Sequence, residues 1–325
     1  MHKKINVAVL YGGNSSEFNI SVKSAEHIAQ SLSDEGYSVF KVLIKADRWT
    51  AFNEQGKEFP VDKNDFSING KPFDLAFPAI HGTPGEDGLL QGYFQALNIP
   101  FTGSSLLTSA LTFNKFFCNQ YLRNYNIDMA RSVLIRKGQK YSADVIIKKL
   151  ALPCFVKPNQ GGSSFGITKV KKKEDFEAAV NHAFTESGEV LVEEFIEGTE
   201  ITCGLFKTTD KDYIFAPAEI VSKNEFFDFQ AKYDSNYNEE IVPARINDEL
   251  TQEVQKLSSD IYDQLNCSGI VRIDYILKGD CFYFLEVNTI PGMTAESIVP
   301  KMMKHAGMTY GQAADLIIRD VSDKS

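Results

Sequence analysis

The chain has 325 residues, which suits two or three domains folded into one compact molecule. Its 43% hydrophobic and 24% charged residues are the proportions of an ordinary globular protein, and they argue against a largely disordered chain. The 34 Lys and Arg against 43 Asp and Glu give a formal net charge of -9, which argues against nucleic acid as a partner but leaves room for a locally basic site that binds one phosphate-bearing small molecule.

The first hundred residues alternate between predicted strands and helices. Strands are predicted at 5–11, 38–44 and 74–80, and helices at 22–32 and 86–98. Such alternation predicts an α/β domain in which helices cover the faces of a parallel sheet.

The remainder of the chain has an α+β pattern in which strands form hairpins. Helices are predicted at 104–124, 175–185 and 248–265, and from residues 296 and 310 onward. Strands are predicted at 132–135, 154–157, 166–170, 190–194, 269–277 and 281–287, and the last two should form a hairpin. We expect three domains, at 1–103, 104–192 and 193–325.

The cysteines and the apolar segments bear on the cellular compartment. Five widely spaced cysteines without a Cys-x-x-Cys pair argue against a disulfide framework and a structural zinc site. No stretch is long and apolar enough to span a bilayer, and the short apolar run after Lys4 does not end in a signal-peptide cleavage pattern. We therefore expect a cytoplasmic protein without a membrane partner.

A glycine-rich segment allows two functional interpretations. The run 162–166 matches the G-x-S-x-G elbow of serine hydrolases, with Ser164 as nucleophile and Glu286 and His305 in triad order. That elbow requires a helix directly after the serine, whereas 167–170 is typical of a strand. A serine hydrolase is thus the weaker alternative.

Phosphate binding accounts for the same segment better. The small residues of 161–164 let backbone N–H groups approach an anion closely. Lys157 ends the strand before them and is a candidate phosphate ligand, although a lysine at a strand end is usually only a solvated charge. No Walker A motif or G-x-G-x-x-G turn occurs elsewhere.

Polar residues alternate on the two strands near the C-terminus. Arg272 and Asp274 lie two apart on one strand, and Glu286 and Asn288 lie two apart on the next. Residues two apart share a face, so Asp274, Glu286 and Asn288 can converge if the strands pair. Carboxylate and amide oxygens suit Mg²⁺, although such a face is also compatible with a simple cross-strand ion pair.

Two loops are further candidates for a site. Residues 81–88 follow a strand at its carboxyl end, where open α/β sheets bind ligands, although they also fit an ordinary turn. Residues 223–240 carry several aromatic side chains without helical periodicity. Loops of that length in compact domains often act as lids.

Taken in chain order, these segments resemble the D-alanine–D-alanine ligase family of the ATP-grasp superfamily, over nearly the whole chain. The landmarks are 12–17, 81–88, Lys115, 157–166, 193–196, 227–233, 272–274, 286–289, 291–294 and Ser297. The resemblance implies an ATP-grasp fold behind an N-terminal parallel-sheet α/β domain, with ATP between the central and C-terminal domains under a lid at 223–240.

The resemblance also implies a reaction. The family joins two D-alanines with ATP to make a peptidoglycan precursor, and so serves cell-wall biogenesis and cell shape. The first carboxylate takes the γ-phosphoryl group to form an acylphosphate, and the amine of the second D-alanine then displaces phosphate. ATP, two Mg²⁺ ions that Mn²⁺ can replace, and a homodimer are implied with it.

The nucleotide and metal roles follow from the same resemblance. It assigns the phosphates to Lys115, Lys157 and Lys232, adenine to Glu193, Glu194 and Ile196, the ribose to Glu200, and the metal ions to Asp274, Glu286 and Asn288. Arg272, with the Gly292 N–H, would stabilise the acyl oxygen as negative charge develops on it.

The resemblance assigns the amino-acid substrates to a second group of residues. Glu17 would bind the ammonium of the first D-alanine, and Glu17, Ser163 and Tyr233 would form the hydrogen-bonded link that closes the lid. Ser297 would bind the second carboxylate, and His81 lies near the substrates in a role left open.

Substrate choice and turnover leave alternatives. Tyr233 favours a dipeptide product over an ester, but Glu296 beside Ser297 leaves open a D-alanine–D-X ligase with another second substrate. An ATP-binding sensor without turnover is a further alternative, and Arg272 argues against it because a pure binder has no use for an acyl-oxygen stabiliser.

Overall fold

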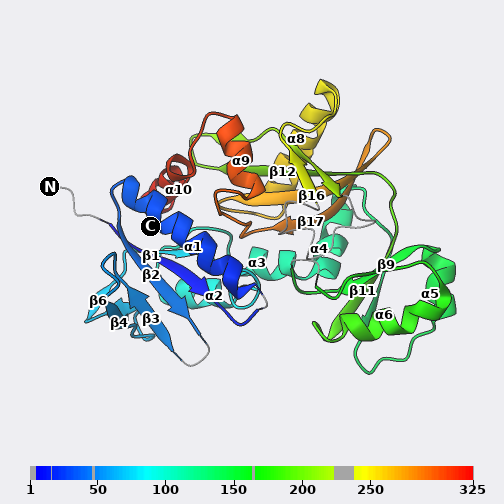
Figure 1. The fold of residues 1–325 in the computed structure, drawn as a ribbon, viewed down its shortest axis with the longest axis horizontal. Helices are drawn as coiled ribbons and strands as arrows, with labels where there is room; N and C mark the ends of the chain where they lie inside the picture. The colour runs from blue at the N-terminus through cyan, green and yellow to red at the C-terminus, as the bar shows by residue number, and fades with distance from the viewer. Residues whose placement is uncertain (1–4, 16, 46–47, 163–164, 223–237, 325) are drawn as a thin grey trace.

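The structure is a computed structural model that describes residues 5–324 except 16, 46–47, 163–164 and 223–237. Figure 1 shows a sheet from the first hundred residues at one end of the molecule and a second sheet, coloured green, at the other. A third sheet, yellow to orange, lies between them above α3 (Leu106–Phe113) and α4 (Lys115–Leu122). Lys115 lies on α4, Lys157 on the second sheet and the C-terminal hairpin in the third sheet.

The N-terminal sheet has the strand order β4-β3-β2-β1-β7. Its strands are β1 (Asn6–Gly12), β2 (Ser38–Ile44), β3 (Trp49–Phe52), β4 (Glu58–Pro60) and β7 (Leu75–Pro78), with a separate pair β5 (Ser67–Ile68) and β6 (Lys71–Pro72). Strands β2, β1 and β7 are parallel, as predicted, but β3 and β4 continue the sheet antiparallel. Four residues separate β2 from β3 and five separate β3 from β4, too few for a crossover helix, so the sheet is mixed, with its parallel part formed by β2, β1 and β7.

Two helices position the carboxyl ends of the parallel strands. Helix α1 (Phe18–Asp34) begins just after β1 and buries Ala25, Ile28 and Leu32, which recur at helical spacing. Helix α2 (Leu89–Ala96) starts later than predicted because residues 81–88 form a loop. The start of α1 and this loop meet beyond β1 and β7.

The helix predicted over 104–124 is two helices, α3 (Leu106–Phe113) and α4 (Lys115–Leu122), followed by the short turn η1 (Arg123–Tyr125). Asn114 has extended backbone angles (φ -90°, ψ 94°), and its side-chain oxygen accepts the Phe117 N–H at 3.0 Å. This N-cap interrupts one helix and begins the next, so that Lys115 becomes the first residue of α4.

The central sheet is antiparallel, in the order β10-β9-β11-β8. Its elements are β8 (Ser132–Arg136), α5 (Ala143–Leu150), β9 (Cys154–Pro158), β10 (Thr168–Val170), the turn η2 (Lys173–Asp175), α6 (Phe176–Ala183) and β11 (Glu189–Glu194). The hairpin pattern around the glycine-rich segment is confirmed, since Thr168 lies opposite Val156. Helices α5 and α6 pack on the apolar side chains of these strands.

The C-terminal sheet has the order β15-β14-β12-β16-β17, with β13 paired to β12. Its strands are β12 (Thr199–Lys207), β13 (Asp212–Ile214), β14 (Ala218–Ser222), β15 (Asn238–Ile241), β16 (Val271–Lys278) and β17 (Cys281–Asn288), and its helices are α8 (Asp248–Gln264), α9 (Ile298–His305) and α10 (Tyr310–Lys324). The predicted hairpin is thus confirmed as β16–β17.

The two ends of the chain share one hydrophobic core. Val299 and Met302 of α9 and Ile317 of α10 belong to the same buried cluster as Val9 and Ala25 near the N-terminus. Helices α1 and α10 accordingly lie side by side (Figure 1). This core fixes the loop after β17 against the end of β7. Among the described residues, no helix has the length and apolar character needed to cross a bilayer.

Candidate active site

The β16–β17 hairpin gathers the three residues that the sequence predicted to converge, Asp274, Glu286 and Asn288, together with Arg272. Arg272 lies opposite Asn288, and Asp274 lies opposite Glu286. Because the strands are antiparallel and the residues alternate, all four side chains share one face. The convergence was therefore predicted correctly from spacing alone.

Asp274 is the centre of this group and is 6% exposed. Arg272 donates to both of its oxygens at 2.8 Å, Thr202 donates its hydroxyl to Oδ1 at 2.5 Å, and Asn288 donates Nδ2 to Oδ2 at 3.0 Å. Burial by itself lowers the pKa of Arg272. The negative charge and hydrogen bonds of Asp274 raise the pKa by more than burial lowers it, so the guanidinium keeps its charge. Asp274 thus receives four hydrogen bonds, two on each oxygen.

The orientation of Asn288 fits a cation-binding role. Its Nδ2 donates to Asp274, so the side-chain carbonyl oxygen is the atom that it offers to a metal ion. Glu286, two residues before Asn288 on the same strand, adds a carboxylate whose side chain is 26% exposed. Within the described ranges no three His, Cys, Asp or Glu side chains form a metal-binding cluster. The set has two carboxylates and one amide, an oxygen donor set that suits Mg²⁺.

Two lysines from other parts of the fold face the same region. Lys115 Nζ lies 3.3 Å from Glu286 Oε2 and donates to the Gly161 carbonyl at 2.8 Å. Lys157 Nζ lies 2.6 Å from Glu193 Oε2, and both of these side chains are about 90% buried. Of the three predicted phosphate ligands, Lys115 therefore contacts the glycine-rich turn, and Lys157 lies on the strand that leads into it.

Asn159 fixes this arrangement, and the sequence analysis did not single it out. The side chain is fully buried and donates to Asn114 Oδ1 at 2.9 Å and to Glu189 Oε2 at 2.7 Å. Its own oxygen accepts the Phe116 N–H at 2.8 Å, and its carbonyl accepts the Lys115 N–H. Asn159 therefore ties the start of α4 to the turn after β9. The one sequence feature that could have pointed to Asn159 is its place directly after Lys157-Pro158, at the start of the glycine-rich segment.

Glu17 lies at the N-terminus of α1 and is 7% exposed. A Cβ atom on Gly162 would lie 2.9 Å from Glu17 Oε2, and one on Gly82 would lie 3.6 Å from it. The glycine-rich turn after β9 therefore reaches across to the predicted ammonium-binding carboxylate. Three predicted partners of this region, Ser163, Lys232 and Tyr233, lie outside the described residues.

His81 connects the N-terminal sheet to the loop after β17. Its Nδ1 lies 3.0 Å from the Ile290 carbonyl, which only accepts, so Nδ1 carries the proton. Its Nε2 lies 3.2 Å from the Ser24 hydroxyl. Burial lowers the pKa of His81, and this exceeds the opposing effect of the Glu17 charge. A neutral ring that accepts from Ser24 and donates to Ile290 is a positioning group.

A second histidine, not singled out from the sequence, has the same role. His27 Nδ1 lies 2.6 Å from the Met293 carbonyl, and its ring packs against Tyr310. His27 and His81 thus hold the segment 289–294 from two elements of the N-terminal part.

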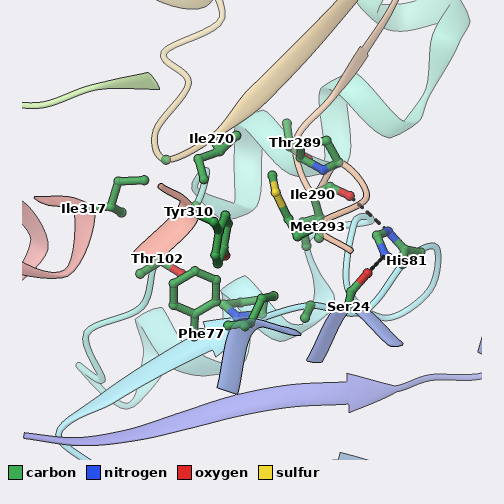
Figure 2. Close-up of a pocket in the computed structure, with 16 residues that line it drawn as sticks. Ser24, Phe77, His81, Thr102, Ile270, Thr289, Ile290, Met293, Tyr310 and Ile317 are labelled. Atoms are coloured by element: carbon green, nitrogen blue, oxygen red, sulfur yellow. Dashed lines mark hydrogen bonds between the residues drawn. The ribbon is translucent and has the colours of Figure 1, made fainter. Parts of the chain in front are cut away.

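A largely apolar cavity lies behind His81 (Figure 2). Its volume is about 40 Å³, with Ser24 and His81 at one end and Ile317 at the other. The buried Tyr310 hydroxyl has no hydrogen-bond partner within the described part of the chain. The cavity is lined by the end of β7 and by the loop after β17, and so borders the predicted substrate region.

Glu86 is a further acidic residue of this region. Its Oε2 accepts the Gly82 N–H at 2.7 Å. Burial, and then the charge of Glu17, raise its pKa to about 8, against the opposing effects of Gly82 and Lys115. The sequence placed Glu86 in a candidate loop without assigning it a role. The structure brings it within electrostatic range of Glu17, Lys115 and Glu286.

Ser297 and Gly292, to which the resemblance gave separate roles, lie close together. Ser297 precedes the first residue of α9, and its Oγ accepts the Thr294 N–H at 3.0 Å. A Cβ atom on Gly292 would lie 3.1 Å from Ser297 Oγ. The segment 292–297 is therefore a tight turn that presents a hydroxyl at a helix N-terminus.

The predicted adenine residues differ in where their side chains go. Glu194 accepts from the backbone and guanidinium of Arg131 at 2.8 and 2.7 Å, so only its backbone remains for a ligand. Glu193 holds Lys157, and Ile196 follows β11 in the connection to β12. Glu200 on β12 lies within electrostatic range of Arg272.

The serine hydrolase interpretation gains no support from the described residues. Glu286 contacts Lys115, and His305 is exposed at the last residue of α9. Strand β10 follows the glycine-rich segment where an elbow would need a helix. Ser164 itself lies outside the described residues.

Comparisons with known proteins agree with the ligase resemblance. The family profiles described as "D-ala D-ala ligase N-terminus" and "D-ala D-ala ligase C-terminus" match residues 6–104 and 122–319. A D-alanine--D-alanine ligase from Phocaeicola vulgatus is 49% identical over 310 residues, 94% of this chain and 95% of that protein.

Solved structures give the same result. The VanG D-Ala:D-Ser ligase from Enterococcus faecalis has a TM-score of 0.85 at 31% identity, covering 98% of this chain and all of that one (100%). The D-alanine--D-alanine ligase from Bacillus anthracis complexed with ATP has a TM-score of 0.81 at 31% identity, covering 99% of this chain and 98% of that one. The ATP-grasp prediction is thereby confirmed, and the chain belongs to the D-alanine–D-alanine ligase family.

Proposed function

We propose that this chain joins two D-alanines with ATP to make D-alanyl-D-alanine for peptidoglycan synthesis. As a family member it is an ATP-dependent ligase that forms a carbon–nitrogen bond. The observation that carries the proposal is the meeting of Glu17, Lys115, Glu286 and Arg272 from four separate elements. Glu17 suits an ammonium, Lys115 suits phosphates, Arg272 suits developing negative charge, and Glu286 suits a metal ion.

The proposed reaction has two steps. A carboxylate oxygen of the first D-alanine, whose ammonium is bound by Glu17, attacks the γ-phosphorus of ATP, and ADP leaves. The amine of the second D-alanine, held through its carboxylate by Ser297, then attacks the acyl carbon, and phosphate leaves. Arg272 and the Gly292 N–H stabilise the oxygen that becomes negative in between. The second amine loses a proton on the way to the amide.

The nucleotide is proposed to lie between the central and C-terminal sheets. Lys115 and Lys157 bind its phosphates, joined by Lys232 from the segment outside the described residues. Backbone groups of 193–196 meet adenine, and Glu200 meets the ribose. The Glu17–Ser163–Tyr233 link is proposed to close the site.

Asp274, Glu286 and Asn288 are proposed to hold two Mg²⁺ ions, which Mn²⁺ can replace. Such ions neutralise phosphate charge when bound. The fit rests on the Asn288 carbonyl oxygen and the Glu286 carboxylate, which lie two residues apart on β17 and face Asp274 and Arg272 on β16. Asp274 joins them once Arg272 turns towards the substrate.

The remaining proposals concern organisation. We retain three domains, at 1–103, 104–192 and 193–325, and a cytoplasmic location where ATP is available. A homodimer fits the exposed apolar side chains on successive helices, Leu89 on α2, Leu107 on α3 and Phe117 on α4, which are 63%, 72% and 50% exposed. Light scattering on the purified protein should give twice the chain mass, and a chain mass would contradict the dimer.

The function is tested by phosphate release from ATP and Mg²⁺ with and without D-alanine, with the product mass read in parallel. D-alanine-dependent release and a dipeptide mass are expected. The neighbouring D-Ala:D-Ser ligase makes D-serine the first competitor for the second position. A mixed product in preference to D-alanyl-D-alanine would reassign the second substrate, and release without D-alanine would contradict the proposal.

A further inference from the structure

Lys115 and Glu286 are in contact, although Lys115 is proposed to bind the phosphates of ATP and Glu286 the accompanying metal ions. The Lys115 ammonium lies 3.3 Å from Glu286 Oε2, and their side chains are 11% and 26% exposed. The ammonium also donates to the Gly161 carbonyl at 2.8 Å. A proposed phosphate ligand is therefore paired with a proposed metal ligand.

The lysine is held in this position by the fold. Lys115 is the first residue of α4, and its N–H donates to the carbonyl of the buried Asn159. Asn159 also receives the next N–H of the helix on its side chain. The Lys115 backbone is thus fixed relative to the turn after β9, and the ammonium stays near Glu286 unless another anion attracts it.

A divalent cation and this ammonium compete for the same carboxylate. Mg²⁺ bound at about 2.1 Å from Glu286 Oε2 would lie within about 5.4 Å of the ammonium. Repulsion between a dication and a monocation at this separation is weakly screened in a partly buried site. A triphosphate removes the conflict because it offers Lys115 a new acceptor and brings negative charge to the metal.

We propose that Lys115 makes metal binding at Glu286 depend on the nucleotide: without phosphates its ammonium opposes the cation, and with them it turns to the phosphate. This rests on the proposed metal role of Glu286. Arg272 stands in the same relation to Asp274, since it is paired with a proposed metal ligand and is expected to meet the acyl oxygen. The site then loads metal and nucleotide together.

Lys157 provides a matched control. It is as buried as Lys115 and is also paired with a carboxylate, at 2.6 Å, but its partner Glu193 lies on β11 outside the proposed metal set. Removing either lysine deletes one positive charge from the same region. Only removal of Lys115 frees a proposed metal ligand.

The test measures Mn²⁺ binding to the full chain without nucleotide, from the electron paramagnetic resonance signal of free Mn²⁺. Lys115→Met should bind Mn²⁺ at least tenfold more tightly than the unmodified protein, and Lys157→Met should stay within twofold of it. Lys115→Gln, which can still donate to Gly161, serves if the Met variant unfolds. The double variant Lys115→Met/Glu286→Gln should lose this increase in Mn²⁺ affinity.

Each other outcome has a distinct meaning. Unchanged affinity in both Lys115 variants, or an equal gain in Lys157→Met, would overturn the proposal while leaving the ligase assignment to the phosphate-release assay. A gain that survives Glu286→Gln would show that the ion binds elsewhere, and would overturn both this inference and the proposed metal set.

Discussion

The two sides of the candidate site are held by different forces. On the N-terminal side, formed by Glu17, His81 and Glu86, side chains are positioned by burial and by backbone groups such as the Gly82 N–H and the Ile290 carbonyl. On the C-terminal side, formed by Arg272, Asp274, Glu286 and Asn288, charged groups hold one another and a lysine from α4.

This difference predicts different sensitivities. Groups whose ionisation is set by burial respond to pH, because a neutral form is favoured in the folded chain. Groups that are paired respond to the loss or reshaping of one partner, because the other is left buried and uncompensated. Substitutions on the two sides should therefore have distinguishable consequences, and the largest should come from the C-terminal side.

The largest effect is expected for Arg272→Lys. Lysine keeps the charge but lacks the rigid fork with which Arg272 donates to both Asp274 oxygens and would face the acyl oxygen. We expect kcat for dipeptide formation to fall by about 100-fold or more, the usual size for a lost oxyanion partner. Steady-state phosphate release measures it.

Arg245→Lys is the matched control for this substitution. Arg245 also makes a bidentate contact, to Glu219 at 2.9 and 2.6 Å, but it lies in the connection after β15 and is largely exposed. Its kcat should stay within about twofold of the unmodified protein, since exposed pairs contribute little. An equal loss of kcat in Arg272→Lys and Arg245→Lys would mean that the bidentate Arg272–Asp274 contact supports folding and has no specific part in the reaction.

The second effect is expected on the N-terminal side, at His81. His81→Leu removes the donor to Ile290 and the acceptor for Ser24, so the segment 289–294 loses one of its two histidine anchors. We expect KM for D-alanine to rise by about tenfold, since a lost buried hydrogen bond costs about 1–1.5 kcal/mol, while KM for ATP changes little.

His81→Asn separates anchoring from ring chemistry. The asparagine amide can still donate to the Ile290 carbonyl from near the Nδ1 position. A KM for D-alanine in His81→Asn that is close to the value of the unmodified protein would support a positioning role. If His81→Asn were as impaired as His81→Leu, the ring itself would have to act in the reaction.

The sequence was informative where a site is built from local spacing. Arg272, Asp274, Glu286 and Asn288 could be grouped in advance because residues two apart share a strand face and the two strands are joined by a short turn. The glycine-rich hairpin at β9–β10 was predictable for the same reason. The family resemblance then supplied roles that spacing alone does not give.

The rest depends on contacts between distant parts of the chain. Asn159 bonds to residues on α4 and β11, and His27 meets Met293 across 266 positions, so neither has a local pattern. Asn114 interrupts an apolar periodicity that otherwise predicts one long helix. The proton on Glu86 follows from burial beside Glu17, which no local spacing reveals.

The smallest effect is expected for Glu86→Gln, and its sign follows from the raised pKa. Glu86 retains its proton in the folded chain up to about pH 8, whereas a free glutamic acid loses it near 4.5. The folded chain therefore binds more protons between these values, and its stability falls as the pH rises through them. Glutamine cannot ionise and can still accept the Gly82 N–H through its oxygen.

We therefore expect the unfolding temperature of Glu86→Gln to exceed that of the unmodified protein at pH 8.5 and to approach or fall below it at pH 5. The difference between the two unfolding temperatures should grow by several degrees from pH 5 to pH 8.5, because the pKa is raised from 4.5 to about 8. Glu54→Gln, at an exposed turn between β3 and β4, should show no such trend. A Glu86→Gln difference that is constant from pH 5 to 8.5 would mean that Glu86 is already ionised in the folded chain, and the contrast between a burial-controlled side and a charge-paired side would no longer hold.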